Sequence, residues 1–191
     1  MTPLVRFTVF ALVGTAGGYF SAQSIISDGI SGLTLTKGPW TAWSEAGTTD
    51  SDPYTKAHFA VKGILPLSKF EAITFHANSD SSGGLFQPEC DYLIEGVRMP
   101  ARAWTLSLTG PGGKFEANPS QRYSFNSENV VRRSNESFTI VLSQTARPGN
   151  WIPMTNATGY SLQLDLFNTL GNARNDPSTI PVPIIKKGTC R

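Results

Sequence analysis

The strongest constraint on this chain is an uncharged segment near its amino terminus. No Asp, Glu, Lys or Arg occurs from Phe7 to Ser27, and the first two thirds of this segment are mostly apolar. At about 1.5 Å per residue, a helix of this length covers about 30 Å, which matches the hydrocarbon core of a bilayer. We therefore predict that residues 1–27 form an N-terminal transmembrane helix.

The charges that flank this segment predict its orientation. Arg6 precedes the segment and Asp28 follows it, so the positive-inside tendency places the N-terminus in the cytoplasm and the remainder of the chain outside. The alternative is a cleaved signal peptide, with Ala22-Gln23-Ser24 as the small-x-small cleavage site. Both interpretations export the rest of the chain, and we favour the uncleaved anchor.

Small residues recur along one side of the predicted membrane helix. Gly14, Gly18 and Ala22 follow one another at four-residue spacing, which allows a second helix to approach closely. This face predicts contact with a membrane protein complex or with another copy of the chain. The alternative is the ordinary tolerance of glycine in membrane helices.

The rest of the chain has the composition of one turn-rich β domain. Only 16% of the 191 residues are charged, whereas Gly (18) and Pro (13) are plentiful. Residues 28–37 are rich in Gly, Ser and Thr and are predicted to be a linker, so the folded domain is expected over residues 38–191. One soluble helix is predicted, with Asp52 as its N-cap, Pro53 at its first position and Gly63 at its end.

Short runs of β-branched and aromatic residues follow, separated by Gly and Pro turns. In one of them Leu162, Leu164 and Leu166 alternate with polar residues, as a half-buried strand requires. This pattern predicts a mainly β protein, an antiparallel jelly-roll-like β-sandwich with one short helix. The predicted strands are 72–77, 92–95, 103–109, 123–125, 137–142, 160–167 and 180–185.

The chain contains two cysteines, Cys90 and Cys190. In an oxidising compartment an isolated pair is most simply a disulfide. The alternatives are two buried free thiols or a metal-binding pair, although no histidine lies at metal-motif spacing from either cysteine.

A series of short motifs makes the chain resemble the bacterial family called domain of unknown function 1214, which often occurs beside its companion domain 1254. The resemblance implies a jelly-roll-like β domain in the bacterial envelope and no established activity. The chain departs from the family pattern at Ala103 and Asp165. The motifs are Asp52-Pro53-Tyr54-Thr55-Lys56-Ala57, Cys90-Asp91-Tyr92, Ala101-Arg102-Ala103-Trp104-Thr105-Leu106, Arg122-Tyr123-Ser124, Gly149-Asn150-Trp151-Ile152-Pro153, Leu166-Phe167-Asn168 and Cys190.

Catalytic motifs are weak. The only histidines, His58 and His76, have no local motif for nucleophilic catalysis, and each is more simply a surface or structural histidine. A cation site is conceivable because imidazole and carboxylates can share a metal, but we expect neither a metal nor a cofactor. The residues of that alternative site are His76, Asp80, Glu89 and Asp91.

The candidate pocket lies at the mouth of the predicted sandwich. It combines His76, Asp80 and Arg102 with Trp151, which follows a turn and is the aromatic residue most expected at the surface; Trp104 is expected in the core.

A net charge of +2 is too small and too dispersed for nucleic-acid binding. The sequence therefore predicts a single-pass protein of the bacterial inner membrane, with its N-terminus in the cytoplasm and its C-terminal domain in the periplasm. The preferred function is a non-catalytic binding or accessory subunit of a membrane assembly. The alternative is an envelope hydrolase that acts on glycan or another exported substrate.

Overall fold

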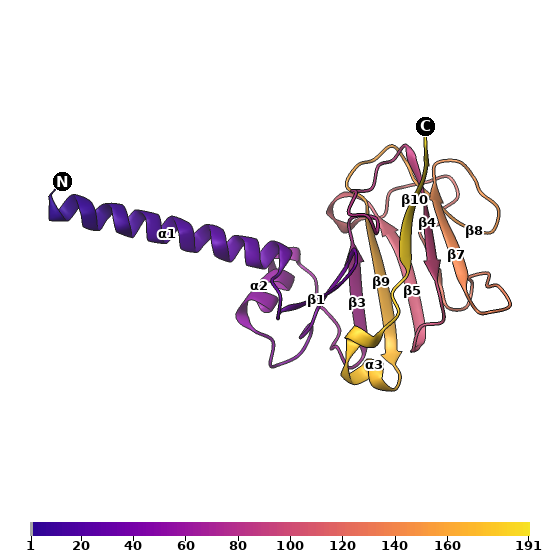
Figure 1. Ribbon diagram of the computed structural model, residues 1–191, viewed down its shortest axis with the longest axis horizontal. Coiled ribbons are helices and arrows are strands. Elements are labelled where there is room, and N and C mark those ends of the chain that lie inside the picture. Colours follow the sequence, from indigo (N-terminus) through magenta and orange to yellow (C-terminus); the bar gives the residue numbers. More distant parts are fainter. Residues whose placement is uncertain (1) are drawn as a thin grey trace.

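The computed structural model describes residues 2–191 as a long helix followed by a β-sandwich (Figure 1). The helix, α1 (Pro3–Asp28), begins at a proline in its first turn and ends at Gly29. It buries no residue, and it is long and apolar enough to cross a membrane by length and composition. The prediction of an N-terminal apolar helix is therefore confirmed.

One layer of the sandwich is a six-stranded antiparallel sheet with the order β1-β2-β3-β9-β5-β6. Its central strand β9 pairs with β3 on one side and with β5 on the other, so Gln163 lies between His76 and Ser107. The strands are β1 (Thr34–Lys37), β2 (Trp40–Trp43), β3 (Ala72–Ala77), β5 (Ala101–Thr109), β6 (Ser124–Asn126) and β9 (Ser161–Thr169).

The second layer is a four-stranded sheet with the order β10-β4-β7-β8. The prediction of a β-sandwich is confirmed, but β7 and β8 pair in parallel rather than antiparallel, because the loop 144–149 returns the chain alongside Ile140 before β8 starts at Asn150. The finer jelly-roll assignment stays a prediction. The strands are β4 (Cys90–Gly96), β7 (Phe138–Ser143), β8 (Asn150–Pro153) and β10 (Ile184–Cys190).

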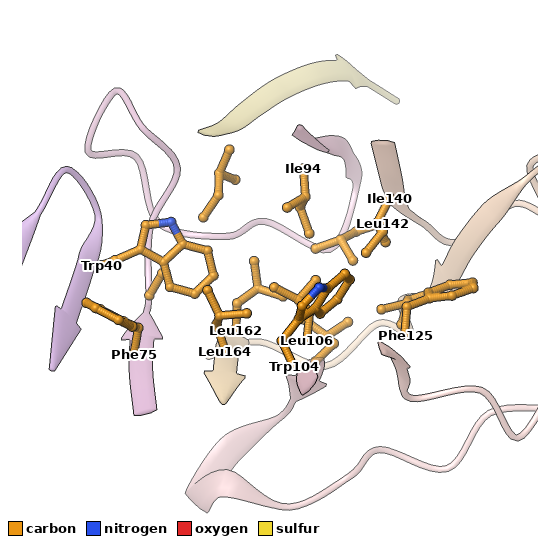
Figure 2. Packing of buried hydrophobic residues seen from close by; sticks show 14 of the residues in the cluster. Trp40, Phe75, Ile94, Trp104, Leu106, Phe125, Ile140, Leu142, Leu162 and Leu164 are labelled. Atoms are coloured by element: carbon orange, nitrogen blue, oxygen red, sulfur yellow. The ribbon is translucent and has the colours of Figure 1, made fainter. Parts of the chain in front are cut away.

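The core lies between the two sheets. Leu162, Leu164 and Leu166 of β9 are fully buried, as their alternation predicts. Figure 2 shows side chains of the two sheets, among them Leu164 and Ile94, pointing into the same space. Trp104 is buried as expected. Removal of this apolar surface from water is the main stabilising contribution to the fold, at about 25 cal/mol per Å².

The longest helix of the folded domain is α2 (Pro53–Lys62). The Asp52 carboxylate accepts hydrogen bonds from the backbone N–H groups of Tyr54 (2.8 Å) and Thr55 (3.1 Å). Gly63 ends the helix in the left-handed conformation with φ 64°. Both caps confirm the helix that the sequence predicted. The remaining short helices are η1 (Pro111–Gly113), α3 (Asn172–Asn175) and η2 (Pro177–Thr179).

Two short segments differ from the expected strand positions. Thr34–Lys37, expected in the linker, form β1 and pair with β2, because a Thr-rich polar strand is stable once a neighbour supplies its hydrogen bonds. The strand expected over 180–185 begins only at Ile184, after two prolines that cannot donate to a ladder.

A disulfide joins β4 to β10. Cys90 and Cys190 are bonded with an S–S distance of 2.02 Å and are separated by 100 residues in the sequence. Cys90 is buried, and the structure contains no free cysteine among residues 2–191. The bond therefore ties the end of the chain to the centre of the four-stranded sheet.

Candidate functional site

The four residues expected to share a pocket lie in different parts of the sandwich. His76 of β3 and Ser107 of β5 both pair with Gln163 of β9, so they lie in one row across the sheet. Arg102 lies at the start of β5, five residues before Ser107. At about 3.4 Å per residue, this separates Arg102 from the row of His76 by about 17 Å along the strands. Trp151 belongs to β8 of the other sheet. The structure therefore does not bring the four together.

Asp80 has a structural role in the turn after β3. Its side chain is 3% exposed, and one carboxylate oxygen accepts hydrogen bonds from the backbone N–H groups of Ser82 (2.8 Å) and Gly84 (3.1 Å). A residue that closes its own turn in this way is a common turn former. Asp80 therefore holds the loop and does not face His76 as a catalytic partner.

Trp151 is half-buried, not the most exposed aromatic residue. Its indole N–H donates to the carbonyl of Ser143 at 2.9 Å, next to the parallel pairing of β7 and β8. The aromatic side chain that the folded domain exposes most is Phe115, at 56%. A stacking surface for a ligand therefore has a better candidate in the loop after β5 than in β8.

His76 stands on the outer face of the six-stranded sheet beside a small polar cluster. Asp165 of β9 accepts hydrogen bonds from Thr74 (2.7 Å) and from the amide of Gln163 (2.9 and 3.1 Å). Burial lowers the pKa of His76, and Lys62 and His58 act in the same direction, whereas Asp165 opposes them. The charged form of the imidazole is therefore disfavoured.

This cluster lacks the parts of a catalytic triad or a metal site. No side chain in the described part of the chain donates to or accepts from the His76 ring, and its neighbouring carboxylate is already occupied. Within residues 2–191 no group of three or more His, Cys, Asp or Glu side chains is arranged to hold a metal ion. The alternative metal site of His76, Asp80, Glu89 and Asp91 is therefore not assembled.

Asp91 serves instead as a link beside the disulfide. It forms an ion pair with Arg147 in the β7–β8 loop. Burial tends to raise the pKa of Asp91, but hydrogen bonds from Ser143 and Arg147 outweigh it, so the pKa lies below its usual value. The carboxylate is ionised and paired, which connects β4 to the neighbouring loop.

A hollow of about 500 Å³ opens between the segment around β6 and the start of β8. Its rim carries hydroxyl, amide and guanidinium groups, and Arg122 is its only charged residue. The Arg122 guanidinium carbon lies 5.6 Å from the Phe125 ring centroid, and none of the ion pairs in residues 2–191 includes Arg122. The lining residues are Ser120, Gln121, Arg122, Tyr123, Ser124, Phe125, Asn129, Val131, Gly149 and Asn150.

Buried Asn150 shapes this hollow. Its amide donates to the carbonyls of Val131 (2.8 Å) and Thr139 (3.0 Å), and its oxygen accepts from the backbone N–H of Val131 (2.8 Å). These bonds clamp the segment after β6 to β8. Beside the hollow, the rings of Phe115 and Tyr123 lie 5.1 Å apart. The arrangement suits a ligand with an anionic group and a flat apolar face.

The sequence-based search missed this hollow because its two walls come from segments far apart in the chain. The segments that include Arg122-Tyr123-Ser124 and Gly149-Asn150 each carry a motif of the family resemblance. They belong to different sheets, and only the folded sandwich, with Asn150 bonded to Val131, brings them together. Both segments are motifs of the family resemblance, and this was the feature of the sequence that could have pointed to a shared site. Gln121 adds a left-handed backbone at φ 48° that no residue pattern predicted.

The third candidate region is the junction of α1 with the domain. The carbonyl of Ile26, near the end of α1, accepts a hydrogen bond from Nδ1 of His58 on α2 at 2.6 Å. The other face of His58 packs on Trp43, with 4.3 Å between the ring centroids. Burial lowers the pKa of His58, opposed by the bond to Ile26. This contact fixes α2 beside the last turn of α1.

Comparison with known proteins gives a family and a fold. The model of the family described as "Protein of unknown function (DUF1214)" matches residues 71–170, more than half of the chain. The crystal structure of the VPA0106 protein from Vibrio parahaemolyticus is similar over 99% of this chain and 46% of its own, with a TM-score of 0.65 and 18% identity. At that identity the likeness shows the fold alone.

A second solved structure, an uncharacterised protein from Burkholderia cenocepacia, is 18% identical over 100% of this chain and 44% of its own, with a TM-score of 0.46. The chain thus spans less than half the length of either solved protein. No protein with a curated description matches the chain.

Proposed function

Because the chain belongs to the family of proteins of unknown function DUF1214, whose description assigns no activity, we propose its role from its own structure. The protein is a single-pass envelope module whose α1 crosses the bacterial inner membrane and whose β-sandwich lies in the periplasm. The sandwich acts as a non-catalytic binding or accessory subunit of a membrane assembly.

One observation carries this proposal. All 26 residues of α1 lie outside the core of the domain, and its large apolar side chains, such as Phe7 and Phe10, are about three quarters exposed. Soluble proteins seldom leave so much contiguous apolar surface in water. A bilayer supplies the missing environment, and a length of about 1.5 Å per residue is sufficient to cross it.

Two features support the periplasmic side. The disulfide between Cys90 and Cys190 fits an oxidising compartment, and Arg6 before α1 fits a cytoplasmic N-terminus. The small residues Gly14 and Gly18 remain exposed on α1, with open space where a side chain would begin. They are the proposed contact for a partner helix, continued by Ala22.

The binding role is assigned to the hollow at Arg122, with the Phe115 and Tyr123 rings beside it. A catalytic role has less support, because His76 has one nearby carboxylate and that group is already hydrogen-bonded. The envelope hydrolase therefore remains only the alternative from the sequence.

The orientation is tested by adding protease to intact spheroplasts. The proposal predicts that the β-sandwich is cleaved only when the outer face of the inner membrane is accessible, and that a short N-terminal fragment is protected. Protection of the whole chain until lysis would refute the periplasmic assignment.

The accessory role is tested by purification from membranes in mild detergent. We expect a membrane protein partner, or a second copy of the chain, to co-purify in stoichiometric amount. The double variant Gly14→Leu with Gly18→Leu should lose this partner, and Val9→Leu, a control on the same helix, should keep it. Recovery of the monomer alone from all three proteins would refute this role.

A further inference from the structure

The segment that ends α2 and leads to β3 exposes an unusual set of large apolar side chains. Leu65 is 95% exposed and Val61 is 74% exposed, and Ile64 and Leu67 are each about half exposed. We call residues 61–67 the apolar loop. Single exposed leucines are ordinary on protein surfaces, but four large apolar side chains within seven residues form a patch that needs a cover.

The apolar loop has a fixed position relative to α1. It begins with the last two residues of α2, Gly63 ends the helix, and the backbone N–H of Ile64 donates to the carbonyl of Phe59. The middle of α2 is attached to Ile26 through His58. Figure 1 shows α2 and the loop after it next to the carboxyl end of α1, on the side of the domain from which α1 leaves.

This position coincides with the outer surface of the bilayer if α1 crosses it. The uncharged segment of α1 ends at Ser27, next to Ile26, so the last turn of α1 marks the boundary of the hydrocarbon core. Residue 65 is seven positions beyond His58, or at most about 25 Å of extended chain. The apolar loop is therefore within reach of the interface.

Two exposed lysines of α2 can reach lipid phosphates, and the junction with α1 also carries exposed Asp28 and Asp50. Lys62 and Lys56 are exposed and have no ion-pair partner within residues 2–191, whereas Lys69 is paired with Glu45 at 2.5 Å. Nearby Asp52 is occupied as the cap of α2. Tyr54, 40% exposed on α2, adds an aromatic side chain of the kind that is enriched at membrane interfaces.

We infer that the apolar loop inserts into the headgroup and acyl boundary of the same bilayer that α1 crosses. Leu65 and Val61 enter the apolar region, and Lys56 and Lys62 contact anionic lipid head groups. Apolar segments at an interface are typically buried about 5–10 Å deep. This inference rests on the proposed function, because it needs α1 to be a membrane helix.

The second attachment restricts the orientation of the domain. With α1 alone in the bilayer, the domain can tilt together with the helix, whereas a second contact through the apolar loop limits that tilt. The hollow at Arg122 lies at the β6 edge of the six-stranded sheet, whereas β1, at the opposite edge, lies close to the carboxyl end of α1 in Figure 1. Insertion of the loop therefore presents the hollow away from the membrane.

Spin labels on the full-length protein test the inference. One cysteine is introduced per variant, as Leu65→Cys in the apolar loop, Ala146→Cys in the exposed β7–β8 loop and Val13→Cys in α1. Because the native cysteines are bonded to each other, the added thiol is the only one available for labelling. Each protein is reconstituted into vesicles of phosphatidylethanolamine and phosphatidylglycerol, and collisions with oxygen and with a water-soluble nickel complex are measured.

We expect the label at 65 to collide severalfold less with nickel and more with oxygen than the label at 146. Replacing Lys56 and Lys62 by glutamine, or using phosphatidylcholine alone, should reduce this difference. Equal nickel collisions at 65 and 146, with a lipid-exposed label at 13, would refute the inference and leave the membrane anchor intact.

Two other outcomes are distinct. A label at 13 that is fully accessible to nickel would refute the proposed anchor itself. Shielding of the label at 65 could also disappear when the protein is reconstituted at a lower protein-to-lipid ratio, with spin–spin broadening at the higher ratio. That result would assign the apolar loop to a contact with a second copy of the chain and overturn the lipid contact.

Discussion

The apolar residues of α1 and those of the β-sandwich have opposite surroundings. Leu164 and Phe75 in the sandwich are fully buried, whereas Phe10 and Leu12 in α1 are 76% and 66% exposed. The sandwich obtains its stability from apolar burial between two sheets. The helix has no such partner within the chain, so its stability depends on an environment that the chain does not provide.

The two regions of the molecule are therefore stabilised by different surroundings. Within the sandwich, a core substitution that changes the volume of the side chain leaves a cavity or an overpacked site. In the first half of α1, where the side chains are exposed, a substitution of one apolar residue by another changes no contact with the sandwich. Where the two regions meet, His58 and Ile26 form the connection.

The largest expected effect comes from truncating the core. Phe75→Ala should lower the free energy of unfolding by about 4 kcal/mol, because it removes a fully buried aromatic ring. Urea denaturation of the full-length protein in detergent measures it. Leu12→Ala is the matched control in α1 and should change this value by no more than about 0.5 kcal/mol. An equal loss in both variants would mean that α1 packs into the core.

The disulfide should contribute next. Replacing Cys90 and Cys190 together by alanine opens a link across 100 residues and should cost about 3 kcal/mol. The same urea titration, repeated on wild-type protein with and without reductant, provides the comparison. A reductant effect that persists in the double variant would show that the stabilisation has another origin.

A smaller effect is expected at the cap of α2. Asp52→Ala should cost about 1 kcal/mol at neutral pH. Burial tends to raise the pKa of Asp52, but its bonds with Thr55 and Tyr54 hold it below the usual 3.8. The unfolded chain therefore binds more protons, so the contribution is present above pH 3.8 and is lost as the pH falls below it. Wild type and variant should converge there; a constant difference would exclude the charged cap.

The smallest effect concerns His76. Burial lowers its pKa below 6.5, so protonation favours the unfolded chain and stability declines as the pH falls through 6.5 and below. His76→Gln should lose part of this decline, and the part due to His58 should remain. Thermal unfolding between about pH 8 and pH 5 measures it. A steeper decline in the variant would contradict the sign of the shift.

The sequence predicted the parts of the fold that depend on local pattern. The leucine alternation in β9 and the Asp52 and Gly63 caps of α2 are properties of adjacent residues, and both were predicted correctly. β1, β2 and the parallel β8 were missed, because they are short strands stabilised by neighbours distant in the sequence. The hollow at Arg122 was missed for the same reason.

The candidate pocket shows the limit of residue types alone. His76, Asp80 and Arg102 are plausible catalytic residues in any sequence, but the strand register separates them and the turn after β3 occupies Asp80. Exposed apolar residues such as Leu65 give no pattern in the sequence, since only the fold shows which apolar side chains remain uncovered.

We propose that α1 remains attached to the domain as a membrane anchor. The intact mass of the protein, extracted with detergent from membranes that have been washed with alkaline carbonate, tests it most directly. We expect the mass of the whole chain, with α1 present, in the membrane fraction. A mass that lacks the residues up to Ser24, or release of the protein by carbonate, would contradict it.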